Sequence, residues 1–404
     1  MAEVQLGTLT NRKIGYGIVQ PGNSVKDGVP VIKVNNLISG LRNVEDLDTT
    51  SIENDNKYSR TKLRGGELVI SVVGTIGKTA IVPMTFKGCN LVRATALIDI
   101  PDAQLALWVK YYIDSPKGQL YIKGNLNTTV QPTLNISSLV EMPIPMFTPE
   151  YRKKVIEILK SLDDKIENNR RINENLEQQA QALFKSWFVD FEPFKDGEFV
   201  ESELGMIPKG WRVETLGSLL EISKKSINPS RNPETLYNHY SIPAYDNNMN
   251  PESQMGKTIL SNKFIVLNKM ILFSKLNPRI KRVWYVDDVP DNSICSTEFV
   301  PYRAKDLVLS EFAYNLIYSQ EFYNYVMSMV NGATGSHQRF HPEDTLTYQF
   351  PYNEDVAVRL SQIVEPMVRR MLDIQRESRR LAELRDTLLP KLMSGEIKVE
   401  DVTF

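Results

Sequence analysis

The sequence predicts an α+β protein in which two similar mixed α/β domains are each followed by a long helix. Three observations lead to this prediction. Residues 149–190 and 351–394 carry apolar positions at alternating steps of three and four, which is typical of long paired helices. Val- and Ile-rich strand-like runs alternate with helical runs elsewhere. Short motifs recur with a period near 205 to 210 residues, which indicates an internal repeat.

Composition narrows the class of protein. The chain has 404 residues, of which 42% are hydrophobic and 24% charged, as in ordinary globular proteins. It has no apolar run of about 18 residues and no signal-peptide pattern, so we expect a cytoplasmic protein without a membrane span. Cys89 and Cys295 lack neighbours at metal-ligand spacing, which predicts buried thiols and no metal site. The net charge of −1 means that nucleic-acid binding would require local basic patches.

The order of elements along the chain predicts six segments. They are a first globular domain at 1–148, a central long helix at 149–190, a Pro- and Gly-punctuated connector at 191–210, a second globular domain at 211–350, a C-terminal long helix at 351–394 and a tail at 395–404. The first domain has strand-like runs at 29–34 and 67–73 and helical runs at 105–113 and 118–122; the second has strand-like runs at 270–273 and 283–286 and one helix at 311–330. The mixture indicates α+β domains but does not reveal the strand order.

Matching motifs support the repeat. The segment LGTL at 6–9 corresponds to LGSL at 216–219, and the strand at 67–73 with its basic loop corresponds to 270–273 with a second basic loop. Gln131 followed by Leu139 corresponds to Gln338 followed by Leu346, and the two cysteines occupy similar places in the halves. A common order of weak matches is more informative than any one of them.

The two helices carry matching heptad seams. A shift of 205 residues superposes Leu159 on Val364 and Leu183 on Leu388. Pro366 is expected to start or kink the second helix. The first seam spans roughly 45 Å, and the remaining positions of its helix are charged. We therefore expect the two helices to pack on each other as an antiparallel pair. The pair would hold apart two domains related by a pseudo-two-fold axis. The apolar seam residues are Leu159, Leu162, Ile166, Leu176 and Leu183 in the first helix and Val364, Met367, Met371, Ile374, Leu381 and Leu388 in the second, with the polar Asn169 and Asn173 predicted to set the register.

Two basic patches occupy equivalent places in the repeat. Residues 57–93 contain seven basic side chains and one acidic one, and residues 269–286 contain five basic and no acidic ones. Either patch alone would be interpreted as a solvated surface, but recurrence in both halves favours contacts with DNA phosphates. The candidate phosphate contacts are Lys57, Arg60, Lys62, Arg64 and Lys78 in the first half and Lys275, Arg279, Lys281 and Arg282 in the second.

Polar, Gly-flanked loops follow each patch. Asn, Gln and Arg side chains can form paired hydrogen bonds with adenine or guanine edges, so these loops are candidate base readers. Simple turns are an equally good explanation for any single residue. The candidate base-reading residues are Asn127, Thr128, Thr129 and Gln131 in the first half and Ser336, His337, Gln338 and Arg339 in the second; His337 and His341 are not predicted to be ligands.

No catalytic motif is found. The segment GTIGKT at 74–79 resembles a phosphate-binding loop, but Val72 occupies the position of the first glycine, and Pro83 interrupts any following helix. A methyltransferase should show a Gly-rich cofactor loop and an Asn or Asp before two prolines and an aromatic residue, and neither pattern occurs. Nuclease clusters and Ser/His/Asp sets cannot be assigned either. The chain is therefore predicted to recognise a ligand without an active site of its own.

Six motifs occur in order along the chain: VVGTIGKT at 72–79, QPTLN at 131–135, MPIP at 142–145, LFKSWFVD at 183–190, SELGMIPKGW at 202–211 and RDTLLPKLMSGE at 385–396. Through them the chain resembles, along essentially its whole length, the specificity subunits of type I restriction-modification systems. The resemblance implies that the two globular domains are target-recognition domains and that the two long helices are spacers. The second half departs from the first where NPRIK at 277–281 replaces the GTIGK form, which suggests that the two halves recognise different sequences.

This resemblance implies a non-catalytic subunit of a prokaryotic complex. Each domain would read one half of a bipartite target in double-stranded DNA, and the helices would set the spacing and dock methylation subunits, with two of these and two restriction or translocase subunits expected. S-adenosylmethionine, ATP and Mg²⁺ would be bound by those partners and not by this chain. Half-sites on one face of B-DNA lie about 34 Å apart, which is compatible with the predicted spacer.

Two other classes of function remain open. A DNA-modifying enzyme in its own right would bind S-adenosylmethionine as a purified chain. A coiled-coil scaffold without a DNA role would show no preference for a bipartite DNA even with its partners present.

Overall fold

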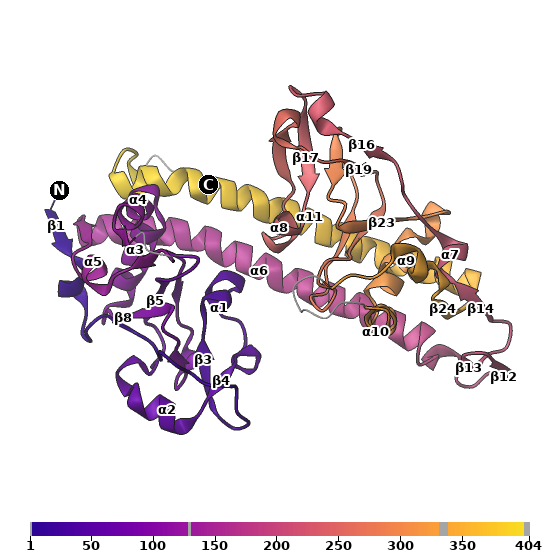
Figure 1. Cartoon of the computed structure of the whole chain (residues 1–404), viewed down its shortest axis with the longest axis horizontal. Helices are drawn as coiled ribbons and strands as arrows, with labels where there is room; N and C mark the ends of the chain where they lie inside the picture. Colours follow the sequence, from indigo (N-terminus) through magenta and orange to yellow (C-terminus); the bar gives the residue numbers. More distant parts are fainter. Residues whose placement is uncertain (1, 128–130, 331–337, 400–404) are drawn as a thin grey trace. The chain divides into compact units, whose positions relative to one another are not determined.

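The computed structural model describes residues 2–127, 131–330 and 338–399. The chain divides into two compact units: unit 1 comprises Met1–Lys165 with Leu381–Phe404, and unit 2 comprises Ile166–Arg380. Two long helices, α6 (Pro149–Phe188) and α11 (Glu354–Ser394), contribute to both units (Figure 1). Each globular part is therefore built on segments of the same two helices.

Unit 1 contains a four-stranded antiparallel sheet in the order β2-β8-β5-β6 and a three-stranded sheet in the order β4-β3-β7, in which β3 and β7 are parallel. Helix α3 packs against β5 and β6. The strands are β2 (Gly15–Tyr16), β3 (Val29–Ile32), β4 (Thr49–Thr50), β5 (Leu68–Ser71), β6 (Thr79–Ile81), β7 (Asn90–Leu91) and β8 (Thr95–Ile98), and the helices are α1 (Val34–Ser39), α2 (Ile52–Lys57), α3 (Ala103–Asp114), α4 (Pro116–Gly124) and α5 (Ile136–Val140).

Unit 2 repeats this plan. Its antiparallel sheet has the order β15-β23-β20-β21, and its second sheet has the order β16-β19-β22-β17-β18, with β17 and β22 parallel. The strands are β15 (Leu220–Ile222), β16 (Ser226–Ile227), β17 (Leu236–Tyr240), β18 (Glu252–Met255), β19 (Lys263–Ile265), β20 (Met270–Ser274), β21 (Val283–Val286), β22 (Ser293–Cys295) and β23 (Phe299–Ala304), and the helices are α8 (Ile242–Asp246), α9 (Ser310–Tyr318) and α10 (Gln320–Ser328). The equivalent orders of the two four-stranded sheets confirm the α+β class and the predicted repeat, while the second sheet has three strands in unit 1 and five in unit 2.

A strand pair closes each unit where the chain passes into a long helix. Strand β1 (Ala2–Gln5) pairs with β11 (Pro143–Met146) directly before α6, and β14 (Arg212–Thr215) pairs with β24 (Gln349–Tyr352) directly before α11. The matching LGTL and LGSL motifs form helical turns after β1 and β14. Their glycines fit against Val140 and Leu346, where a Cβ would lie 2.6 and 3.1 Å from the nearest atom. The LGTL and LGSL motifs therefore repeat because each places a glycine where a larger residue would not fit.

Contacts between α6 and α11 show that the helices are antiparallel, as predicted. In unit 1 the Tyr151 hydroxyl donates to the Leu392 carbonyl at 2.8 Å, and Asp163 pairs with Arg385 at 2.8 Å. In unit 2 the Asn169 amide donates to Glu377 at 2.8 Å and to Ser378 at 3.2 Å. The partner number falls as the α6 number rises, and Asn169 sits fully buried in the seam. A polar seam residue with a partner on the other helix favours this register.

The buried face of each helix widens where a globular core covers it. Leu159, Leu162, Val364, Met371 and Ile374 of the predicted seam are buried, whereas Ile166, Leu176, Leu183, Met367, Leu381 and Leu388 are partly exposed. Phe184, Phe188 and Leu392, outside the seam, are buried in domain cores. Each helix therefore packs against its partner helix and against a globular core. The heptad pattern predicted the contact between the two helices but not the contact of each helix with a globular core.

Several expected elements differ from those observed. The helix expected at 311–330 is two helices, because Ser319 is extended and its side chain caps the start of α10. Ser115 does the same between α3 and α4. The run at 29–34 is a strand only to Ile32, and α11 continues through Pro366 from Glu354. The connector contains the hairpin β12 (Phe199–Ser202) and β13 (Gly205–Pro208).

Gly17 offers a test of packing in unit 1. It is buried beside β7, and an added Cβ would lie 2.2 Å from the Leu91 backbone. We expect Gly17→Ala to lower the free energy of unfolding by about 2–3 kcal/mol, because neither backbone can yield easily. Gly15→Ala is the matched control, since its nearest contact would be 3.8 Å away. Urea unfolding followed by circular dichroism measures both, and equal stability of the two variants would contradict the packing.

Candidate nucleic-acid interface

The first edge loop, residues 72–78, connects β5 to β6. Ser71 N–H donates to the Lys78 carbonyl at 2.8 Å, and Lys78 N–H donates to the Ser71 hydroxyl at 2.8 Å. Gly74 and Gly77 have φ of 78° and 85°, a conformation that favours glycine. The loop is followed by a strand, whereas a phosphate-binding loop is followed by a helix. Its glycines therefore serve a tight turn in a sheet.

Polar segments lie beside this loop. The short strands β9 (Leu126–Asn127) and β10 (Thr133–Leu134) pair with each other, and Leu134 N–H donates to the Val72 carbonyl at 2.9 Å. A bridge between Val73 and Thr133 continues this contact. The structure thus brings the exposed Lys78, Asn127 and Gln131 to one edge of unit 1. Thr128 and Thr129 lie outside the described residues.

Arg93 belongs to the same edge, although sequence reasoning did not select it. Val72 N–H donates to the Ala94 carbonyl at 2.8 Å, so the segment before β8 runs beside the first edge loop. The Arg93 side chain is exposed there. Its place in the basic patch was visible in the sequence, but its nearness to Lys78 depends on the antiparallel pairing of β5 with β8.

The remaining basic candidates of unit 1 lie elsewhere. Arg60 and Lys62 have their carbonyls against the Arg12 guanidinium, at 3.3 and 2.8 Å, and Arg12 also pairs with Glu67 and Asp99. This cluster marks the beginning of β5, whereas Lys78 follows its end. Lys57 pairs with Glu53, and Lys62 with the buried Asp55, while the Arg60 and Arg64 side chains are exposed. The structure therefore divides the first basic patch between two ends of a strand.

The second edge loop, residues 275–282, connects β20 to β21 in the same way. Ser274 N–H donates to the Arg282 carbonyl at 3.0 Å, which makes Arg282 the counterpart of Lys78. Asn277 N–H donates to the Gln338 carbonyl at 3.1 Å, so this loop also lies beside the predicted base-reading segment. Ser336 and His337 lie outside the described residues. The structure again joins a basic loop to a polar segment.

The cations of the second edge loop differ in accessibility. Arg279 is exposed and Lys275 is partly exposed. Arg282 is only 9% exposed and forms a two-bond pair with Asp246, at 2.7 and 2.9 Å. The Lys281 ammonium lies 4.0 Å from the centre of the Tyr318 ring. Lys275 and Arg279 are thus the cations of this loop best placed for a phosphate.

Gln338 and Arg339 have different surroundings. The Gln338 side chain is 8% exposed, whereas Arg339 is exposed and pairs with Glu298 through two nitrogens, at 3.0 and 3.1 Å. The hydrogen bond to Glu298 raises the pKa of Arg339, so its charge is retained. A planar guanidinium held at an exposed edge is suited to a base edge or a phosphate, provided that it exchanges Glu298 for that partner.

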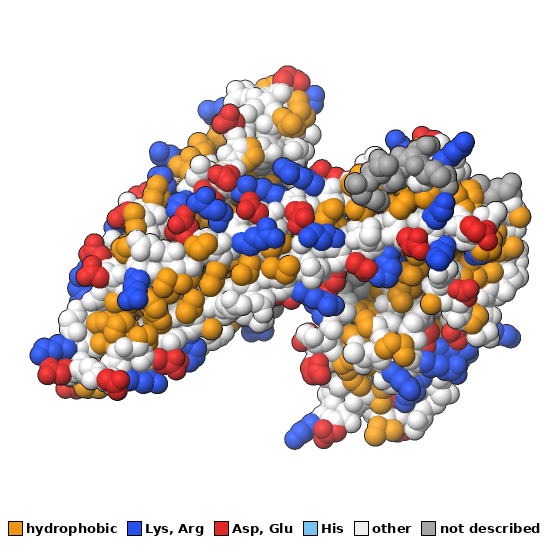
Figure 2. All heavy atoms as spheres, turned by 180° about the vertical axis from the view of Figure 1, so that it is seen from behind, with side chains coloured by type: hydrophobic (Ala, Val, Ile, Leu, Met, Phe, Trp, Pro, Cys, Tyr) orange, Lys and Arg blue, Asp and Glu red, His pale blue; other side chains and the backbone are white. Residues whose placement is uncertain are grey.

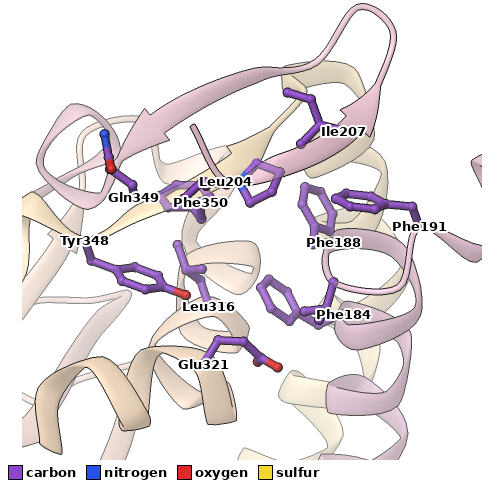
Figure 3. A pocket seen from close by; sticks show the side chains of 12 residues that line it. Phe184, Phe188, Phe191, Leu204, Ile207, Leu316, Glu321, Tyr348, Gln349 and Phe350 are labelled. Atoms are coloured by element: carbon purple, nitrogen blue, oxygen red, sulfur yellow. The ribbon is translucent and has the colours of Figure 1, made fainter. Parts of the chain in front are cut away.

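An apolar pocket lies at the end of α6 in unit 2. It is lined by Phe184, Phe188 and Phe191 and by Leu204 and Ile207 of the β12–β13 hairpin, and Figure 3 shows Phe188 and Phe191 beside Ile207. Phe188 and Phe191 also contact Trp211, at 5.1 and 5.4 Å between ring centres. The sequence motifs LFKSWFVD and SELGMIPKGW therefore meet in one aromatic cluster that packs the hairpin against the helix.

Charge patterning, metal-ligand clusters and membrane-spanning helices add no further candidate site among the described residues. Basic and acidic side chains are interspersed on the face drawn in Figure 2. Among residues 2–127, 131–330 and 338–399, no group of three His, Cys, Asp or Glu side chains is arranged to hold a metal ion. Of the helices in these ranges, none has the length and apolar character needed to span a membrane.

Comparison with known proteins identifies a consistent set of relatives. Residues 8–178 match the family model described as the type I restriction modification DNA specificity domain. The MjaIX specificity subunit of Methanocaldococcus jannaschii is 29% identical over 316 residues, covering 74% of this chain and 71% of that protein. The HindI specificity subunit of Haemophilus influenzae is 24% identical over 339 residues, covering 66% and 71%.

A solved structure shows the same fold. The S subunit of a type I restriction-modification system from M. genitalium aligns with a TM-score of 0.52 at 14% identity, covering 97% of this chain and 95% of that one. The likeness includes unit 2, of which the family model matches only residues 166–178. The predicted resemblance is confirmed, together with the predicted fold.

Lys78 tests the first edge. Because its exposed ammonium forms no ion pair with any described residue, we expect Lys78→Ala to weaken DNA binding at all sequences and to reduce the slope of log affinity against log salt by about one. Lys57→Ala removes the same charge where Glu53 already neutralises it, and should change the slope less. Fluorescence anisotropy across a salt series measures both. Equal slopes for Lys78→Ala and the parent chain would refute a phosphate contact.

Proposed function

We infer that this chain is a specificity subunit of a type I restriction-modification system and is the part of the complex that selects the DNA sequence. It is not the catalytic part, since its relatives are specificity subunits. The observation that carries this proposal is the repeated strand-end arrangement. In each unit a basic loop after the central strand contacts a polar segment distant in sequence.

The arrangement is suited to bipartite recognition. Cations at a strand end can neutralise phosphates, which positions a duplex without reading its sequence. The adjoining Asn127, Gln131 and Arg339 can form hydrogen bonds with base edges in the major groove. We propose that the edge of unit 1 reads one half-site and the edge of unit 2 reads the other. The different side chains on the two edges imply two different half-site sequences.

We propose two recognition domains, at 1–148 and 211–350, and two spacer helices, at 149–190 and 351–394. The connector is at 191–210 and the tail at 395–404. The spacer helices would set the distance between half-sites, because each is continuous over about 40 residues. Their exposed charged faces are the proposed docking surfaces for methylation subunits. Two methylation subunits and two restriction subunits would complete the assembly, in the cytoplasm of a prokaryote.

The partners would supply the cofactor chemistry. Methylation of adenine requires S-adenosylmethionine, and translocation with cleavage requires ATP and Mg²⁺. We propose that all three are bound by the partner subunits. Long-read methylation sequencing of the host with and without this gene tests the whole proposal. It should reveal one bipartite adenine motif that disappears with the gene, and an unchanged methylation pattern would refute the proposal.

The polar segments test half-site recognition. We expect Gln131→Ala to relax one half-site and Arg339→Ala to relax the other, each by about 1–3 kcal/mol of discrimination, because a base contact is lost in one unit only. Methylation-site sequencing of both variants measures this. An unchanged motif after both substitutions would contradict the assignment of base readers.

The helices test the spacer. Deleting residues 169–175 together with 371–377 removes one heptad from each helix opposite its partner, since Asn169 contacts Glu377 and Asn173 contacts Met371. The pair shortens by about 10 Å, close to three base pairs of B-DNA. We expect methylation of a library with varied spacers to lose the parental spacer length. Retention of that spacer would show that the helices do not set it.

A further inference from the structure

A carboxylate of the spacer helix is held by two tyrosines of unit 2. Glu177 lies on α6 and is partly buried. One of its oxygens accepts a hydrogen bond from the Tyr314 hydroxyl at 2.9 Å, and the other accepts one from the Tyr318 hydroxyl at 2.7 Å. Both tyrosines lie on one face of α9, four residues apart. Glu177 thus fixes α9 through both of its oxygens.

The contact between Glu177 and the two tyrosines is largely shielded from water. Tyr314 is 4% exposed. Burial raises the pKa of Glu177, while the hydrogen bonds from Tyr318 and Tyr314 act in the opposite direction. Burial and then the Glu177 charge raise the pKa of Tyr318, so its hydroxyl remains a donor. Hydrogen bonds to a carboxylate away from water are stronger and more directional than those at the surface.

Lys281 links this cluster to the second edge loop. Its ammonium donates to the Tyr318 carbonyl and lies 4.0 Å from the centre of the Tyr318 ring. Burial lowers the pKa of Lys281, and Glu177 supplies the leading negative charge that opposes this effect. The same tyrosine therefore contacts Glu177 through its hydroxyl and Lys281 through its ring and carbonyl. The charge on α6 helps to retain the charge at the end of the loop.

The rest of the loop depends on neighbouring contacts. The Tyr323 hydroxyl donates to the Arg279 carbonyl at 3.0 Å, and the Lys281 ammonium is 5.9 Å from the Tyr323 ring. Asn277 N–H donates to the Gln338 carbonyl, which joins the loop to the segment that holds Arg339. A shift of Lys281 would consequently move Arg279 and the contact with Gln338. The backbone on either side of Lys281 is thus held by Tyr323 and by the segment that contains Arg339.

We propose that Glu177 is a positioning residue for recognition of the second half-site. It holds Tyr318 and Lys281, and through them the second edge loop, in the conformation that presents Arg279 and Arg339 to DNA. This inference rests on the proposed function. It assigns to the spacer helix a role in reading one half-site in addition to its role as a spacer.

The test uses the full chain assembled with the methylation subunits of its own system. Glu177→Gln keeps the shape of the side chain but removes its charge and one acceptor. We expect about a tenfold loss of discrimination at the second half-site, the size of one charge-assisted contact, with an unchanged first half-site. Methylation of a randomised DNA library, normalised to the amount of assembled complex, measures the preference at each position.

Two further variants separate positioning from folding. Lys281→Met removes the ammonium but keeps an unbranched side chain over Tyr318, and Tyr318→Phe removes only the hydroxyl. Both should reproduce the relaxed second half-site, and Glu177→Gln combined with Lys281→Met should be no more severe than either alone. Gln181→Ala is the matched control. Gln181 also joins α6 to α9, through Asn315 at 2.9 Å, but forms no hydrogen bond with Tyr318 or Lys281 among the described residues.

The outcomes are distinguishable. Relaxation confined to the second half-site in the Glu177, Lys281 and Tyr318 variants, with the Gln181 variant unchanged, supports the inference. An unaltered second half-site in Glu177→Gln, or equal loss at both half-sites, overturns it. If the parental chain itself directs no bipartite methylation, the proposed function fails and this inference fails with it.

Discussion

The core of each globular unit is completed by segments of both long helices. In unit 1, Leu159 from α6 and Leu392 from α11 are fully buried in the same apolar cluster as β5 and α3. In unit 2, Phe184 from α6 and Leu360 from α11 are buried with β20 and α9. Burial of a large apolar side chain contributes about 1.5–3 kcal/mol, so several such residues bind each unit firmly to the helix pair. The placement of each edge loop on the helices follows from this shared core.

The two units use one backbone plan with different side chains. Lys78 and Arg282 occupy equivalent positions after the central strand, yet Lys78 is exposed while Arg282 is buried against Asp246. The glycines that turn the first edge loop are replaced by Asn277, which adopts φ of 48° in the second. Because the two units share the sheet but differ in the side chains at the end of its central strand, each could bind a different half-site. The buried pair also removes a cation from the surface that the charge pattern alone had assigned to DNA.

Local sequence patterns predicted the repeat and the long helices. Features that depend on contacts between residues distant in sequence could not be predicted. The heptad steps from Leu159 to Leu183 depend on neighbouring residues, so the antiparallel helices were predictable. The parallel pairing of β3 with β7, across some 60 residues, was not. For the same reason the sequence could not show that Arg282 pairs with Asp246, that Gln338 is buried, or that Glu177 contacts Tyr318. The charge pattern of the sequence predicted the candidate interface, but the packing of the side chains shows which cations are exposed and could contact DNA.

The most direct test of the account is photo-cross-linking of the assembled complex on DNA that carries its bipartite target. A photoreactive side chain is introduced at position 131 in one preparation and at position 339 in another, since both native residues are exposed at their edges. The account predicts that position 131 cross-links within one half-site and position 339 within the other. Cross-links from both positions to the same half-site, or from neither to either half-site, would contradict it.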